Sequence, residues 1–388
     1  MKHNDDLDTA RRLLTRFIEI PSVNPADDPE SEGESAVAAE IAAYCTAIGM
    51  EVTFEDVFPG RPNVEAILRA PNAQGALLFE VHTDTVALPL GEVVPTARSV
   101  GNRIYGRGAC DVKGGLVAIL LALKDLSENR QDLTADIILL GAADEESQFR
   151  GVVKYLESPR QVDGAVVIEP TVLRSVIGHS GCVRFTVTVN GTSAHSSRPE
   201  LGRSAIRDAF TAILALDDWS AKRSKEALVP PRKPPQLTVN RITGGRAFNI
   251  VPDLCTFDVD IRTVSSDDPQ AVLDELGALL ESLSATGVRA HISEVVILGW
   301  GLEPDPLALI NSAAKSALTS NGVDPEEEYV TFGTDASKLT RLGGIPSIVL
   351  GPGDANQAHT DDEHVELDEI LKARDIYRDI ALEFGRGL

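Results

Sequence analysis

The stretch LLFEVHTDTV, residues 77–86, joins a largely apolar run of strand-forming residues to a His-x-Asp pair. Such a run is typical of a strand that is covered on both faces of its sheet. His82 and Asp84 stand where this strand should end. The end of the strand is therefore the first candidate for a functional site in this chain.

Similar apolar segments recur along the chain and alternate with segments of helical periodicity. Strands are predicted at 64–68, 76–82, 136–142, 165–170 and 346–351, and helices are predicted at 7–19, 34–48 and 114–126. Buried strands that alternate with helices indicate an α/β domain with a covered, mostly parallel sheet.

The pattern changes near residue 182. The segment VRFTVTVNG, residues 183–191, alternates apolar and polar residues, as in a strand with one solvent-exposed face. The order that follows, with a proline-rich loop at 229–235, is that of a ferredoxin-like α+β unit: strand, helix, two strands, helix and strand. The predicted organisation is an α/β domain of residues 1–181 and 293–388, into which residues 182–292 are inserted.

The composition argues against some classes of partner. The chain of 388 residues has 59 Asp and Glu against 36 Lys and Arg, which gives a formal net charge of −23. Repulsion opposes binding to nucleic acid and to anionic membranes, so neither is an expected partner. The four cysteines are scattered and favour neither a zinc ribbon nor a disulfide framework. Because the sequence shows neither a secretory signal nor an apolar run of about eighteen residues, we expect a cytoplasmic protein.

Side chains of metal-ligand type follow several of the predicted strands. They are His82, Asp84, Asp111, Glu145, Glu146, Glu169 and His359. Taken singly, each has a simpler explanation, since the acidic triplet at 144–146 can begin a helix and Asp111 can cap one. Their convergence on the edge where α/β sheets bind ligands favours a shared site.

This set of side chains is sufficient for a two-metal site. Two histidines and three carboxylates can hold two zinc ions if one carboxylate bridges them. Two ions roughly 3.5 Å apart can activate one water molecule and polarise an amide carbonyl. Asp84 is placed to accept the second ring N–H of His82 and so to fix its tautomer. Of the neighbours Glu145 and Glu146, one can bind metal while the other accepts a proton, and the sequence alone leaves their assignment open.

Seven motifs resemble those of a family of dinuclear zinc hydrolases. They are HTDTV, GRGACDVKGG, DEE, IEPT, GTSAHSSRPELGRSAI, GGRAFNIVPD and LGPGDANQAHTDDEHVEL. The family includes acetylornithine deacetylase, succinyl-diaminopimelate desuccinylase, aminoacylases and glutamate carboxypeptidases. The resemblance covers nearly the whole chain. It implies a zinc-peptidase-like catalytic domain, an inserted domain that serves as lid and dimerisation domain, and a homodimer.

The resemblance also implies the metal ligands. His82, Asp111 and Glu169 match the ligands of one Zn²⁺, and Asp111, Glu146 and His359 match those of the other. Co²⁺ is expected as a substitute, since His and carboxylate ligands suit both metals. The peptide bond after Asp111 is implied to be cis.

Further residues match the family's catalytic and substrate-binding positions. By the resemblance, Glu145 is the general base and Asp84 orients the histidine at the end of the first strand. His195 matches a histidine that reaches the partner subunit's active site and stabilises the oxyanion. Asn249 and Arg262 match positions of the lid that bind the substrate carboxylate.

Other functions fit the sequence less well. GRGACDVKGG resembles a nucleotide-binding loop only superficially, because Asp111 stands where the third glycine should meet the pyrophosphate. A non-catalytic binding protein on this scaffold should lack the base or a ligand, and none is missing. Glu169 is the variant that resembles deacylases and carboxypeptidases. The segments EPT, residues 169–171, and LGPG to NQAH, residues 350–359, look most like acetylornithine deacetylases. We expect an N-acyl amino acid deacylase acting on a small N-acyl amino acid or short peptide, with a desuccinylase or a glutamate carboxypeptidase as the alternative.

Overall fold

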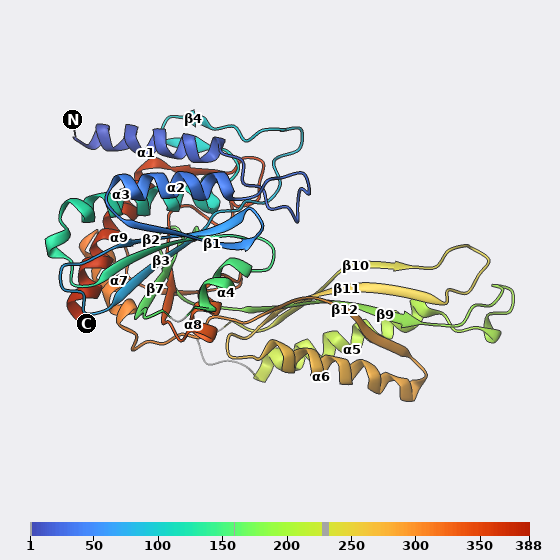
Figure 1. Ribbon diagram of the computed structural model, residues 1–388. Coiled ribbons are helices and arrows are strands. Elements are labelled where there is room, and N and C mark those ends of the chain that lie inside the picture. The colour runs from blue at the N-terminus through green and yellow to red at the C-terminus, as the bar shows by residue number, and fades with distance from the viewer. Residues whose placement is uncertain (1, 159, 227–232) are drawn as a thin grey trace. The chain divides into compact units, whose positions relative to one another are not determined.

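The computed structural model describes residues 2–158, 160–226 and 233–388 of the chain (Figure 1). The chain divides into two compact units, each with its own hydrophobic core. Unit 1 comprises residues 1–177, 304–328 and 334–388, and unit 2 comprises residues 178–303 and 329–333.

Unit 1 is built on an eight-stranded sheet. Its order is β1 (Glu51–Phe58), β2 (Arg61–Leu68), β6 (Asp136–Ala142), β3 (Ala76–His82), β7 (Gly164–Val167), β14 (Ser347–Val349), β8 (Ser175–His179) and β13 (Glu327–Val330). The central strands β6, β3, β7 and β14 are parallel, whereas β1, β2 and β8 join antiparallel. All seven residues of β3 are buried, as expected for a strand that is covered on both faces. The predicted α/β class with a mostly parallel central sheet is confirmed.

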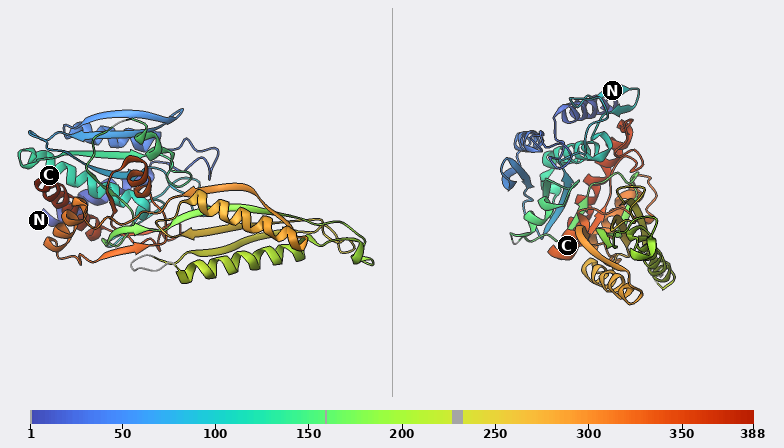
Figure 2. Two further views of the ribbon diagram at one scale, coloured as in Figure 1. Left: turned by 90° about the horizontal axis from the view of Figure 1, so that it is seen from below. Right: turned by 90° about the vertical axis from the view of Figure 1, so that its right-hand side faces the viewer.

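Helices cover both faces of this sheet, as two further views show (Figure 2). The larger core includes Leu77, Phe79 and Val81 of β3 and buried residues of five helices. These helices are α1 (Lys2–Glu19), α2 (Ser35–Ala47), α3 (Gly114–Glu128), α7 (Leu309–Ser320) and α9 (Leu367–Gly387). Two short helices, α4 (Arg150–Leu156) and α8 (Ala336–Gly343), pack on each other, and α4 contacts β2 while α8 contacts β7. No helix in the described ranges has both the length and the apolar character that spanning a membrane requires.

A small antiparallel sheet lies beside the end of α1. Its order is β15 (His364–Glu366), β5 (Arg103–Tyr105) and β4 (Arg98–Val100). The sheet joins two segments that are far apart in the sequence, because His364 pairs with Tyr105 and Glu366 pairs with Arg103.

Unit 2 contains a four-stranded antiparallel sheet with two helices on one face (Figure 1). The elements are β9 (Gly181–Asn190), α5 (Ala205–Glu226), β10 (Gln236–Gly244), β11 (Leu254–Thr263), α6 (Pro269–Ser282) and β12 (Arg289–Gly299). The strand order β10-β11-β9-β12 is that of a ferredoxin-like fold. The inward residues of β9 and β11 alternate with outward ones, which is the pattern read from the sequence. The proline-rich loop predicted at 229–235 lies mostly outside the described residues.

Candidate metal-binding active site

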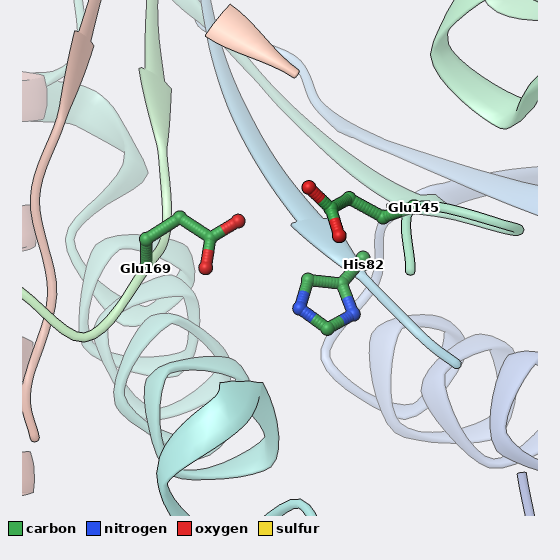
Figure 3. A group of neighbouring side chains, drawn as sticks. All are labelled: His82, Glu145 and Glu169. Atoms are coloured by element: carbon green, nitrogen blue, oxygen red, sulfur yellow. The ribbon is translucent and has the colours of Figure 1, made fainter. Parts of the chain in front are cut away.

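The ends of three neighbouring parallel strands bring a histidine and two glutamates together in unit 1. His82 ends β3, Glu145 follows β6 and Glu169 follows β7. One ligand atom of each of these residues lies within 4.8 Å of the others. Figure 3 shows the two carboxylates and the imidazole ring turned toward a common space. Parallel strands end at one edge of the sheet, which explains why distant segments converge here.

Asp111 links this group to a second one. Its Oδ1 lies 3.0 Å from Nε2 of His82, and its Oδ2 lies 3.3 Å from Nε2 of His359. The same nitrogen of His359 lies 3.1 Å from Oε1 of Glu146. The peptide bond between Asp111 and Val112 is cis, as the resemblance implied. Asp111 therefore has the central position that a bridging ligand requires.

Asp84 lies beside Nδ1 of His82 with both its main chain and its carboxylate. Nδ1 of His82 lies 3.0 Å from the main-chain carbonyl oxygen of Asp84, whereas the Asp84 carboxylate is 3.6 Å away. A carbonyl oxygen can only accept, so Nδ1 carries the proton. Nε2 faces Oδ1 of Asp111 at 3.0 Å, and because a carboxylate can only accept, Nε2 also carries a proton in this metal-free arrangement. Once that proton is released, Nε2 would offer its lone pair to a metal ion. Asp84 therefore faces Nδ1 of His82 with its main-chain oxygen at hydrogen-bond distance and with its carboxylate slightly farther away.

The Asp84 carboxylate also orders the two glutamates after β6. Its Oδ1 accepts the main-chain N–H of Glu145 and its Oδ2 accepts that of Glu146, both at 3.1 Å. Asn24 donates to Oδ2 at 2.7 Å. Asn24 was not predicted from the sequence, because it lies in a loop outside the motifs.

Charged side chains also hold the residue that precedes the two glutamates. Asp144 is fully buried and has a φ of 70°, which is uncommon for a residue other than glycine. Its carboxylate lies 2.5 Å from Arg150 and 3.3 Å from Arg61, and its N–H donates to Glu34 at 3.1 Å. These contacts fix the turn that directs Glu145 and Glu146 into the site.

The electrostatics of the group fit a metal centre. Burial raises the pKa of Glu145, and the nearby Glu169 raises it further. Burial also raises the pKa of Glu169. Carboxylates held close together in this way are destabilised by their own charge, which divalent cations among them would neutralise. The donors are imidazole nitrogens and carboxylate oxygens, which suit Zn²⁺ and Co²⁺.

The remaining predicted residues lie in unit 2, at two different places. His195 and Asn249 lie on paired segments, since Ser196 N–H donates to the carbonyl oxygen of Asn249 at 3.0 Å. Both side chains are exposed. Arg262 lies at the other end of the sheet, where Cys182 is its partner on β9. The structure therefore brings His195 and Asn249 together but does not bring Arg262 to them.

Contacts with Ser197 select the tautomer of His195. Ser197 donates its main-chain N–H to Nδ1 of His195 at 3.1 Å, and its hydroxyl lies 2.8 Å from the same nitrogen. Since Nδ1 accepts, the proton of the neutral ring is on Nε2. The exposed edge of the ring is therefore a hydrogen-bond donor.

Comparison with known proteins identifies the family. The sequence model of peptidase family M20/M25/M40 matches residues 78–383. The chain belongs to this family. Acetylornithine deacetylase from Salmonella agona is 30% identical over 396 aligned residues, which cover 96% of this chain and 99% of that protein. The M20 chain is therefore a hydrolase of the metallopeptidase type, and these matches support a deacylase or peptidase role.

Solved structures share the fold of the M20 chain. A tripeptidase from Staphylococcus aureus has a TM-score of 0.79 and 21% identity, with 98% of this chain and 99% of that chain covered. A Bacillus subtilis protein described as a dinuclear metal-binding peptidase of family M20 has a TM-score of 0.73 and 15% identity, with 98% of each chain covered. At these identities the likeness concerns the fold alone.

Proposed function

We propose that this M20 hydrolase is a metal-dependent N-acyl amino acid deacylase of the acetylornithine deacetylase type. The proposal rests on the convergence of two histidines, one aspartate and three glutamates at the carboxyl edge of the sheet. These residues are His82, His359, Asp111, Glu145, Glu146 and Glu169. Acetylornithine deacetylase from Salmonella agona supports the deacylase, because its 30% identity extends over nearly the full length of both chains, whereas the two peptidases named above are only 21% and 15% identical.

The proposed metal ligands are those implied by the resemblance. His82, Asp111 and Glu169 would hold one ion, and Asp111, Glu146 and His359 would hold the other. The contacts of Asp111 with both histidines support its role as the bridge. Two bound Zn²⁺ or Co²⁺ ions would supply a Lewis acid that activates water and polarises the scissile carbonyl.

Glu145 is proposed as the general base. Its carboxylate lies beside His82 and Glu169, whereas Glu146 contacts His359. Glu145 would take a proton from the attacking water and return it to the nitrogen of the departing amino acid. Burial and then the charge of Glu169 raise the pKa of Glu145 in the metal-free protein.

His195 is proposed to donate Nε2–H to the carbonyl oxygen of the substrate as negative charge develops there.

Asn249 and Arg262 are proposed to bind the substrate carboxylate. From Leu254 to Arg262, β11 spans roughly 25 Å, since a strand rises about 3.3 Å per residue. Asn249 precedes Leu254, so one substrate carboxylate cannot reach Asn249 and Arg262 of the same unit 2. The two roles are compatible if the residues come from different subunits.

A homodimer is therefore part of the proposal. The outer face of α5 supports it, because Phe210 and Leu214, one helical turn apart, are 60% and 63% exposed. Large exposed apolar side chains that adjoin on one face are typical of protein interfaces. A cytoplasmic location stays a prediction.

The test is a screen of purified protein, supplied with Zn²⁺ or Co²⁺, against N-acetyl amino acids, N-succinyl-diaminopimelate and dipeptides ending in glutamate. Release of free amino acid from N-acetyl substrates with the highest kcat/KM would support the proposal. Preference for the succinyl compound would assign a desuccinylase, and preference for the dipeptides would assign a carboxypeptidase. Absence of turnover on all three classes by metal-loaded protein would refute the deacylase.

A further inference from the structure

A buried ion pair lies next to the proposed metal site without supplying any of its ligands. Nη1 of Arg107 lies 2.7 Å from Oε2 of Glu363, and the two residues are only 6% and 2% exposed. Arg107 lies just after β5, and Glu363 directly precedes β15. Two buried charges are costly unless their remaining donors and acceptors are also used. The other contacts of the pair therefore indicate its role.

Glu363 fixes the main chain at Asp111. Its Oε1 accepts the N–H of Cys110 at 3.0 Å and the N–H of Asp111 at 3.1 Å. A carboxylate that accepts two successive N–H groups fixes the orientation of that stretch of backbone. It thereby sets the direction in which the Asp111 side chain leaves the chain.

Arg107 connects two further segments to this point. Its Nε donates to the carbonyl oxygen of Ala87 at 2.8 Å, on the segment that continues from His82. Its Nη1 also lies 3.3 Å from the carbonyl oxygen of Thr360, the residue after His359. The planar guanidinium has donors in a fixed fork, so it can hold both carbonyl groups and a carboxylate together.

We infer that Arg107 and Glu363 are positioning residues for the metal centre. The pair holds the three segments that carry His82, Asp111 and His359 in one arrangement, so that both oxygens of Asp111 meet their histidines. This inference rests on the proposed metal site. An ion pair that only stabilised the fold would leave the affinity for metal unchanged, and this difference decides between the two roles.

The test measures the affinity of the full-length protein for Zn²⁺ and Co²⁺ by competition with a chromophoric chelator. The variants are Arg107→Lys, which keeps the charge but loses the fork, and Glu363→Gln, which keeps the shape but loses the charge. We expect each to bind metal about 10- to 100-fold more weakly than the wild type, as is usual when a group that orients a metal ligand is changed. The absorption spectrum of bound Co²⁺ should also change, because it reports ligand geometry.

A matched control is available on the same two segments. Arg103 and Glu366 form an ion pair at 3.0 Å, with side chains 49% and 43% exposed, between β5 and the end of β15. The double variant Arg103→Gln, Glu366→Gln removes this pair and should keep wild-type metal affinity and the wild-type Co²⁺ spectrum.

The outcomes separate this inference from the proposed function. Arg107→Lys and Glu363→Gln proteins that unfold at a lower temperature but bind metal with wild-type affinity would overturn the inference and leave the metal site intact. A folded wild-type protein that binds neither ion would overturn the metal site itself. If Glu363→Gln does not fold, the milder Arg107→Lys decides alone.

Discussion

The carboxylate of Asp84 accepts the main-chain N–H of Glu146 at 3.1 Å. Its second oxygen accepts the N–H of Glu145 at the same distance. One side chain at the end of β3 thus fixes the path of the chain after β6. The proposed base and a proposed metal ligand are therefore oriented by a residue that contacts neither of their carboxylates.

Asp84→Asn should disturb both roles at once. An amide has one accepting oxygen, so one of the two main-chain N–H groups would face an NH₂ group instead. We expect kcat and metal affinity each to fall about 10- to 100-fold, measured by steady-state kinetics and chelator competition. Asp27→Asn is the control, since Asp27 accepts the N–H of Ala87 at 3.2 Å in the exposed loop nearby. Wild-type kcat in Asp84→Asn would contradict this role.

Glu145→Gln and Glu146→Gln should fail in different ways. The first change removes the proposed proton acceptor, so kcat should fall about a hundredfold to ten-thousandfold while metal content stays at the wild-type value. The second removes a charged ligand beside His359, so the protein should lose metal during dialysis. Metal analysis by mass spectrometry, together with kcat, distinguishes the two. The reverse pattern would exchange the roles of the two residues.

His195→Ala should lower kcat about a hundredfold to a thousandfold without loss of metal, as for other donors to a developing oxyanion. Mixing inactive His195→Ala chains with inactive Glu145→Gln chains should restore part of the activity if His195 acts on the partner's substrate. A hybrid dimer then has one complete site. Hybrids that form, as shown by native mass spectrometry, but remain inactive would rule out the shared site.

Metal binding should release protons, so the affinity of the protein for metal should increase as pH rises. Hydrogen bonds with Asp111 and then with Glu146 raise the pKa of His359 from 6.5 to about 10 in the metal-free protein. An incoming ion must displace this proton, so affinity should increase up to about pH 10. Titration calorimetry at pH 8 in buffers of different ionisation enthalpy measures the release, which His359→Ala should reduce.

The same shift has a consequence for the metal-free fold. A pKa that is raised in the folded state stabilises the protein below the unfolded value of 6.5, and this stabilisation is lost as pH rises through about 10. His359 is half exposed, so solvent screening reduces the effect. Thermal unfolding in excess chelator at pH 6 and pH 10 should show a smaller difference for His359→Ala than for the wild type.

The sequence predicted those parts of the site that depend on where strands end. His82, Glu145 and Glu169 were found because buried strands have a distinctive apolar pattern and parallel strands end at one edge. The resemblance assigned Asn249 and Arg262 to one substrate carboxylate, and their separation along β11 emerged only from the structure.

Contacts between distant segments could not be predicted in this way. Glu363 contacts the main chain of Asp111 across 252 residues, and Asn24 contacts Asp84 across 60. The groups that Glu363 and Asn24 contact are main-chain groups or single polar atoms, which leave no periodic pattern in the sequence. Secondary-structure propensity therefore does not predict these contacts. The only signal for Glu363 was its place in the motif LGPGDANQAHTDDEHVEL, where an acidic residue directly precedes His364.

The two histidines of the proposed centre differ sharply in their access to solvent. The side chain of His82 is 2% exposed, and that of His359 is 52% exposed. An ion held by His359 would have a half-exposed ligand, whereas an ion held by His82 would have a buried one. The two ions should therefore exchange at different rates, the outer one first. Protein made in a medium that contains several divalent metals would then carry two different ions. The position at His82 would keep the metal that was present during folding. The position at His359 would hold the metal that was present at harvest.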